Sequence, residues 1–109
     1  MNHVSLVGRL AKDPSSTSNK VATVIVATER VKLDGEGKTY KDAETGYTAK
    51  ETEFHKVTCF NGTARSVVEH LKKGALVSVE GRLHYSDWTD KDGIKRYGVE
   101  ILADRLTFL

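Results

Sequence analysis

A chain of 109 residues is long enough for one domain with a single hydrophobic core. Its 17 lysines and arginines barely outnumber its 15 aspartates and glutamates, so the net charge is only +2, whereas proteins that bind duplex DNA usually carry a larger basic excess. No apolar run approaches the ~20 residues that cross a bilayer, and the N-terminus lacks a signal-peptide pattern, so we expect a soluble, cytoplasmic protein.

The first half of the chain has the pattern of three β-strands. His3 to Leu10 mostly alternates apolar and polar residues, Val21 to Thr28 is rich in β-branched residues, and Thr52 to Phe60 alternates again. The cluster Asp13-Pro14-Ser15-Ser16 predicts a turn between the first two strands.

A long polar stretch, Val31 to Lys50, separates the second and third predicted strands. It is too polar for a core and too long for a tight turn, so we expect a protruding hairpin arm. Loops of this length in compact domains are usually functional or disordered. Tyr40 and Tyr47 lie in this arm.

Gly62 to Lys73 is the one segment with helical periodicity. Asn61 or Thr63 can cap its start, and Gly74 follows its end. One apolar stripe supports the helix and consists of Ala64, Val67, Val68 and Leu71.

Two further strands, Leu76 to Tyr85 and Arg96 to Leu109, flank a hairpin turn at Asp90-Lys91-Asp92-Gly93. The sequence therefore predicts one all-β domain over residues 1–109. Five strands with a single α-helix between the third and fourth follow the order of the OB-fold barrel, with long hairpin arms after the second and fourth strands. The strand 2–3 face and loops of that barrel bind oligonucleotides.

The third strand carries the strongest functional pattern. Side chains alternate across a strand, so His55, Val57 and Cys59 share one side, which is apolar enough for the core. The other side should be open to solvent because a lysine is costly to bury. It consists of Phe54, Lys56, Thr58 and Phe60. Exposed phenylalanines beside a lysine favour stacking of nucleobases and contact with phosphates; the alternative is that one phenylalanine packs under the arm.

Trp88 lies in a polar setting beside the predicted hairpin tip, which argues against a place in the core. A binding contact is more plausible there than a local packing role. Tyr40 and Tyr47 are further candidates for stacking. Basic side chains near these positions include Lys38, Lys41, Lys50, Lys72, Lys73 and Arg96.

Patterns typical of catalysis are missing from the sequence. The four histidines lack the spacing of a metal site, and Cys59 has neither a bridging partner nor a neighbour that would activate its thiol. His55 is more typical of a structural histidine than of a general base. We therefore expect no enzyme, no cofactor and no metal; a small nuclease has no residue cluster to support it.

Several spaced motifs run along the chain: 2–10 (NHVSLVGRL) with Asp13-Pro14, 52–57 (TEFHKV), 71–74 (LKKG) with 79–83 (VEGRL), and 88–90 (WTD) with Gly93 and 96–97 (RY). Together these motifs resemble one known family, the bacterial single-stranded-DNA-binding proteins. They follow the family's order over nearly the whole chain. The sequence departs from the family in having Phe54 and Tyr40 where tryptophan is common, and in a longer arm.

The resemblance implies a homotetramer that binds and protects single-stranded DNA in replication, recombination and repair. Trp88, Phe54, Phe60 and Tyr40 match the family's stacking positions. Lys56, Lys73 and Arg96 match its basic contacts, and His55 matches a subunit contact. The first strand, with Val4 and Leu6, is apolar on both faces and compatible with pairing at a subunit edge.

The acidic tail through which the family recruits replication and repair proteins is not encoded in these 109 residues. We expect either a trimmed domain or a tail-less relative from a phage, plasmid or bacterial chromosome. The family further implies association with the nucleoid. An alternative is a protein-interaction module related to the primosomal replication proteins, which share the barrel.

Overall fold

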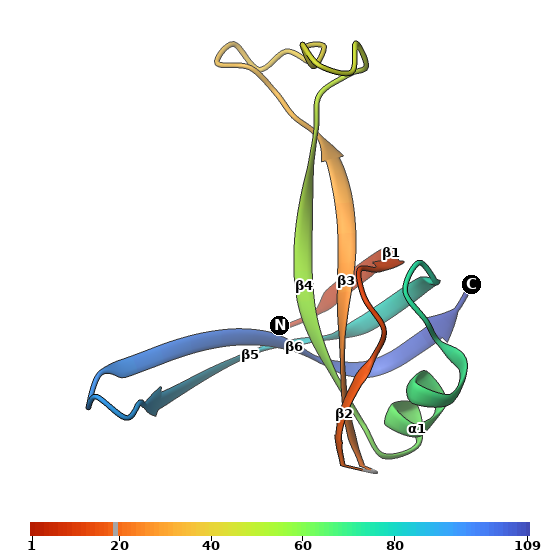
Figure 1. The fold of residues 1–109 in the computed structure, drawn as a ribbon, viewed down its shortest axis with the longest axis vertical. Coiled ribbons are helices and arrows are strands. Elements are labelled where there is room, and N and C mark those ends of the chain that lie inside the picture. The colour runs from red at the N-terminus through yellow and green to blue at the C-terminus, as the bar shows by residue number, and fades with distance from the viewer. Residues whose placement is uncertain (19) are drawn as a thin grey trace.

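The computed structural model describes residues 1–18 and 20–109, and this part of the chain contains six strands and one helix (Figure 1). The elements in chain order are β1 (Val4–Leu10), β2 (Ser15–Ser18), β3 (Val21–Val31), β4 (Lys50–Phe60), α1 (Asn61–His70), β5 (Leu76–Thr89) and β6 (Lys95–Phe108).

Five of the strands close into a barrel. The sheet runs in the order β1-β5-β6-β4-β3, and β1 also pairs with β3 through Arg9 and Leu10, which joins the two ends. The β4–β6 pair is parallel, and the other pairs are antiparallel. The predicted OB-fold barrel, with its helix between the third and fourth barrel strands, is confirmed.

Two hairpins extend beyond the barrel in different directions (Figure 1). One is the 32–49 arm between β3 and β4, and the other is the outer part of the β5–β6 pair. Both pairs of strands are longer than the sequence predicts, because cross-strand pairing continues past the barrel as far as Val31↔Lys50 and Thr89↔Lys95.

β2 was not expected, since its residues overlap the predicted turn. Ser15–Ser18 instead pairs antiparallel with β3, with an irregularity between Ser16 and Ser18. Its four residues are all exposed, so the strand adds an edge to β3 and no apolar residue to the core.

The helix starts earlier and ends earlier than predicted. Its N-cap is Phe60, with no side-chain cap, and Asn61 has a positive φ of 54°, so the predicted caps at Asn61 and Thr63 are wrong. It ends at His70 because the chain must turn back to β1: the Gly74 N–H donates to the Leu10 carbonyl. Of the predicted stripe, Val68 is exposed.

The core fills the barrel between its strands and α1. Most of its largest fully buried side chains are valines, and β-branched residues suit the strands that contribute all but one of them. They include Val24, Val26, Val57, Val67, Val77 and Val79. Cys59 lies among them, and burial raises its pKa to about 11, so the thiol stays protonated at neutral pH and is poorly reactive.

Candidate functional site

β4 turns one row of side chains outward, and its two phenylalanines are open to solvent. Phe54 is 65% exposed and Phe60 is 42% exposed, whereas Val57 and Cys59 on the other side of the strand are fully buried. The alternation predicted from the sequence therefore holds for the aromatic members of this row, which we call the outer row of β4 (Phe54, Lys56, Thr58 and Phe60).

Neither phenylalanine lies under the 32–49 arm. The arm joins β4 at Lys50, and Phe60 lies at the opposite end of that strand, where it pairs with Val21. Thr58 departs from the prediction, since it is buried between Thr23 of β3 and Leu102 of β6. The open part of the outer row thus consists of Phe54, Lys56 and Phe60.

An ion pair connects the outer row to the β5–β6 hairpin. Nζ of Lys56 lies 3.6 Å from Oε2 of Glu100 on β6. Positions 96, 98 and 100, occupied by Arg96, Gly98 and Glu100, share one face of β6 by alternation. The outer row therefore continues onto this face of the hairpin, which we call the front face. Glu100 was not predicted as part of the site, because its place beside Lys56 depends on the parallel register of β4 and β6.

Trp88 lies on the front face, within β5 and directly opposite Arg96 on β6. Half of its surface (51%) is exposed. Its ring lies over Gly98: a Cβ built on that glycine would be 3.1 Å from the Cζ3 atom of Trp88 and 3.3 Å from Cη2. A glycine therefore lets the indole lie close to the strand while its other side faces solvent.

Replacing Gly98 by valine should lift the indole away from β6, because the added methyl groups occupy the space that the ring covers. We expect the fluorescence maximum of Trp88, the chain's one tryptophan, to shift to longer wavelength as the ring becomes more hydrated. Gly35→Val, at a position with no atom within 4 Å of a built Cβ, is the matched control. An unchanged emission spectrum in Gly98→Val would contradict this packing.

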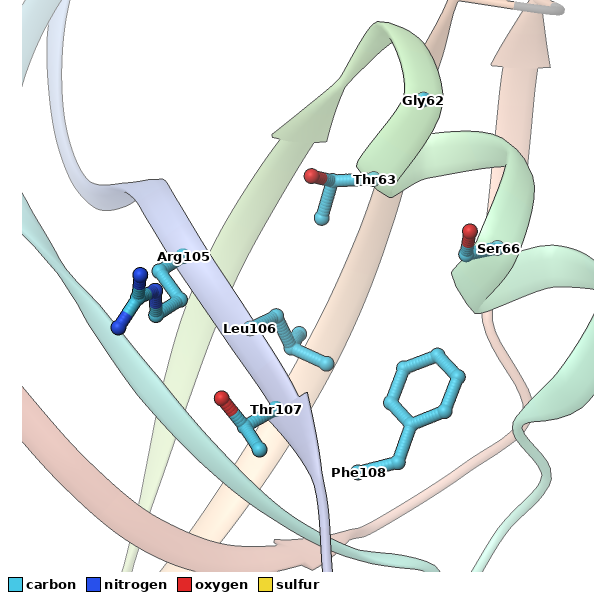
Figure 2. Close-up of a pocket in the computed structure, with 7 residues that line it drawn as sticks. All are labelled: Gly62, Thr63, Ser66, Arg105, Leu106, Thr107 and Phe108. Carbon is cyan, nitrogen blue, oxygen red and sulfur yellow. The ribbon is translucent and has the colours of Figure 1, made fainter.

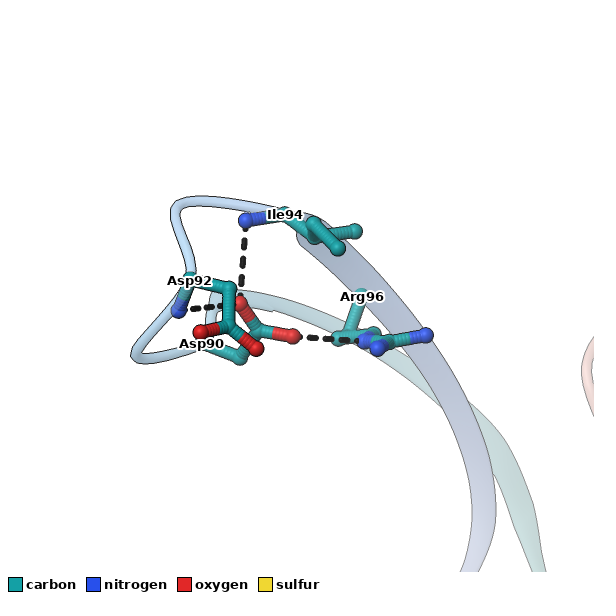
Figure 3. A network of polar contacts seen from close by, with 4 residues as sticks. All are labelled: Asp90, Asp92, Ile94 and Arg96. Carbon is teal, nitrogen blue, oxygen red and sulfur yellow. Dashed lines mark hydrogen bonds and ion pairs between the residues drawn. The ribbon is translucent and has the colours of Figure 1, made fainter.

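Arg96 is held in place by the hairpin turn (Figure 3). Oδ2 of Asp90 accepts a bond of 2.9 Å from the Arg96 Nε–H, while Oδ1 accepts bonds of 2.9 Å from the backbone N–H groups of Ile94 and Asp92. The Ile94 bond, followed by the Arg96 bond, lowers the pKa of the Asp90 carboxyl. The carboxylate thus fixes the turn and orients a guanidinium beside Trp88.

The 32–49 arm is an ordered hairpin. Two aspartates shape its turns: Oδ1 of Asp34 accepts from two backbone N–H groups, and so does Oδ1 of Asp42. Tyr40 lies between these two turns, Tyr47 follows the second one, and both rings are exposed. The predicted protruding arm is confirmed, and it carries two accessible aromatic rings.

Lys73 lies away from both strand rows, in the connection between α1 and β5. Its backbone N–H donates to Oδ1 of Asp13 at 2.8 Å, and its side chain is exposed. Phe54 and Lys56 lie on the outer row of β4, and Trp88 and Arg96 lie on the front face of the hairpin. The Lys56–Glu100 ion pair is a contact between the two, whereas Lys73 is placed separately.

The residues predicted to contact another subunit are partly buried within this chain. Val4 and Leu6 pack against the core, while Val7 on the other face of β1 is exposed. His55 is partly buried, with Nε2 2.8 Å from the Thr28 hydroxyl. β1 pairs with β3 only at Arg9 and Leu10, so the edge of Val4 to Gly8 that faces away from β5 is not paired with β3.

A separate hollow of about 680 Å³ lies between α1 and the end of β6 (Figure 2). Its lining residues are Gly62, Thr63, Ser66, Arg105, Leu106, Thr107 and Phe108. None of the residues predicted to contact nucleic acid lines it, so it is distinct from the outer row and the front face.

Metal-ligating residues do not gather anywhere in 1–18 and 20–109: no group of three or more His, Cys, Asp or Glu side chains could hold an ion there. Within the same residues, no helix is long and apolar enough to cross a membrane.

Comparisons with known proteins agree with this architecture. Residues 1–109 match the model of the single-strand binding protein family. The chain is 39% identical over 109 residues to single-stranded DNA-binding protein 1 of Xylella fastidiosa, covering 100% of this chain and 77% of that protein. It is 35% identical over 114 residues to the mitochondrial single-stranded DNA-binding protein 1-B of Xenopus laevis, covering 100% and 76%.

The fold has a counterpart among solved structures. A Plasmodium falciparum SSB in complex with ssDNA matches with a TM-score of 0.76 at 24% identity, covering 100% of this chain and 95% of that one. This likeness supports the barrel fold.

Proposed function

Since the chain belongs to the single-strand binding protein family, we propose that it binds single-stranded DNA without sequence preference and without catalysis. The observation that supports the proposal is that the rings of Phe54 and Trp88 are both exposed, on two strand faces that the Lys56–Glu100 ion pair connects. Stacking on such rings tolerates any base because every base has a π-face.

In this proposal bases stack on Phe54, Phe60 and Trp88, and cationic side chains contact the phosphates between them. Tyr40 and Tyr47 extend the surface onto the 32–49 arm. Lys56 and Arg96 are each paired with a carboxylate in the DNA-free protein, so each would partly exchange its carboxylate for a phosphate. Lys73 would contact a phosphate outside the strand rows.

Two further features of the family are proposed for this chain. One is a homotetramer, supported by the unpaired outer edge of β1 and by exposed Val7. The other is a role in protecting single strands during replication, recombination and repair, with association with the nucleoid. The alternative of a primosomal interaction module predicts weaker preference for long single strands and a replication protein recovered by pull-down.

Binding should weaken only moderately with salt, because the net charge is +2 and the basic contacts are few. Three phosphate contacts, from Lys56, Lys73 and Arg96, predict a slope of about −2 for log K against log[salt], from about −0.7 per contact on single strands. Titrating oligothymidine at several salt concentrations measures this slope, and Lys73→Ala should make it shallower by about 0.7. A slope near zero would contradict the phosphate contacts.

A further inference from the structure

The β5–β6 hairpin has a second exposed face, opposite the front face. Tyr85 pairs with Val99 and Asp87 pairs with Tyr97, so these four side chains share one face, together with Leu83. Closer to the barrel, the next residue on the same face of β6 is Ile101, which is buried in the core. This reverse face is therefore the inner surface of the barrel continued beyond the point where the other strands cover it.

The aromatic rings on the reverse face are more exposed than Trp88 itself. Tyr85 is 71% exposed and Tyr97 is 73% exposed. Because they are diagonal neighbours on adjacent strands, about 7–8 Å apart at Cα, both can border the same hollow. The structure has such a hollow, of about 400 Å³, lined by His84, Tyr85, Ser86, Asp87 and Tyr97.

The residues that line this hollow come from both faces of the hairpin. Tyr85 and Tyr97 belong to the reverse face, whereas His84 and Ser86 alternate onto the front face with Trp88. A ligand bound on the front face could therefore pass around β5 and reach the two tyrosines without a break in contact.

The edge of β5 at this point is open for hydrogen bonds. β1 pairs with β5 only as far as Gly81, and the Asn2 side chain then bonds both the N–H and the C=O of Leu83 at 2.9 Å. By strand periodicity, the N–H and C=O groups of Tyr85 and Asp87 point to the same edge. They offer donors and acceptors beside the two rings.

A cation completes the reverse face. Nζ of Lys95 lies 5.7 Å from the centroid of the Tyr97 ring and 3.5 Å from Oδ2 of Asp87. Its side chain is 60% exposed, so a phosphate could approach it as readily as Asp87 does. The reverse face thus repeats the chemistry of the front face, where Trp88 lies opposite Arg96 and Arg96 is paired with Asp90.

From these contacts we propose that the reverse face is a second base-stacking site, in which Tyr85 and Tyr97 stack bases and Lys95 contacts a phosphate of the same single strand. This inference rests on the proposed binding of single-stranded DNA by the front face. A long strand passes around the edge of β5 and occupies both faces, whereas a short strand occupies the front face alone.

The test compares the double variant Tyr85→Thr/Tyr97→Thr with Tyr85→Phe/Tyr97→Phe. Threonine keeps strand propensity and removes both rings, whereas phenylalanine keeps the rings. Oligothymidines of increasing length are titrated against each protein. The threonine variant should bind the shortest strands like the wild type and the longest about tenfold or more weakly, while the phenylalanine variant matches the wild type throughout.

Wild-type affinity of the threonine variant at every length would overturn the second site. A second result would also overturn it: the threonine variant has a lower sedimentation mass without DNA and binds oligothymidines of all lengths equally more weakly than the wild type. That result would make the reverse face an interface between copies of this chain. If the wild-type protein binds no oligothymidine, the front-face proposal is overturned as well. This outcome can be distinguished from one in which only the reverse face fails to bind. Melting temperatures of both variants check that the barrel remains folded.

Discussion

Replacing Trp88 by alanine is expected to weaken oligothymidine binding by about 1–3 kcal/mol, and Phe54→Ala should have an effect of the same size, because each change removes one stacking surface. Both rings are more than half exposed in the DNA-free protein, so neither truncation leaves a cavity in the core. Binding is measured with a labelled oligonucleotide by fluorescence anisotropy, since Trp88→Ala removes the protein's own tryptophan signal.

Phe108 provides a matched control for these two variants. It is an exposed aromatic residue at the end of β6, where it borders the separate hollow and packs against His70 with ring centroids 6.2 Å apart. Phe108→Ala should leave binding unchanged, and Trp88→Phe should retain part of the wild-type affinity. Equal weakening in Phe108→Ala and Phe54→Ala would contradict a specific role for the outer row of β4.

Replacing Gly81 by alanine is expected to destabilise the fold by about 3 kcal/mol or more. A Cβ at this position would lie 2.1 Å from the carbonyl oxygen of Leu102 and 3.0 Å from its carbonyl carbon. Both are backbone atoms, so no side-chain rotation relieves the contact. Gly81 also lies at the irregularity where β5 and β6 shift register, so the strands must separate to admit a methyl group.

Thermal unfolding measured by circular dichroism tests this expectation. The Tm of Gly81→Ala should fall by about 10 °C or more, given the usual relation between stability and Tm for domains of this size. Gly35→Ala is the control, because no atom lies within 4 Å of a Cβ built there. If the two variants unfold at the same temperature, the close approach of β6 to Gly81 is wrong.

Local patterns were sufficient to predict the barrel. Alternation and β-branched residues located the strands, and the polar stretch from Val31 to Lys50 located the arm. The ends of the elements depend on tertiary contacts instead. α1 ends early because Gly74 bonds to Leu10, and β2 forms because β3 offers a partner to residues that read as a turn. Neither contact is visible in a local window of sequence.

In the candidate site, too, local sequence predicts some features, while others depend on tertiary contacts. Period-two alternation placed Phe54 and Lys56 on an open face, which the structure has. The neighbours that join this face to the hairpin could not be predicted, because Glu100 reaches Lys56 only through the parallel pairing of β4 with β6. Thr58 was misplaced for a related reason, since its burial depends on Thr23 and Leu102 in the flanking strands.

The reverse face of the hairpin was missed because the fourth predicted strand ended at Tyr85. Had the alternation been followed to Thr89, Leu83, Tyr85 and Asp87 would have formed one side and Trp88 the other. The exposed tyrosines are therefore recoverable from sequence once the length of the hairpin is known. That length follows from cross-strand pairs that continue to Thr89 and Lys95.

The central claim is that single-stranded DNA stacks on the surface that joins Phe54 to Trp88. Its most direct test is to titrate the wild-type protein with oligothymidine at low salt while following the fluorescence of Trp88, the chain's one tryptophan. Stacking of a base on the indole predicts quenching that saturates with added strand, together with a mobility shift of the oligonucleotide. Unchanged Trp88 fluorescence with no mobility shift would contradict the claim.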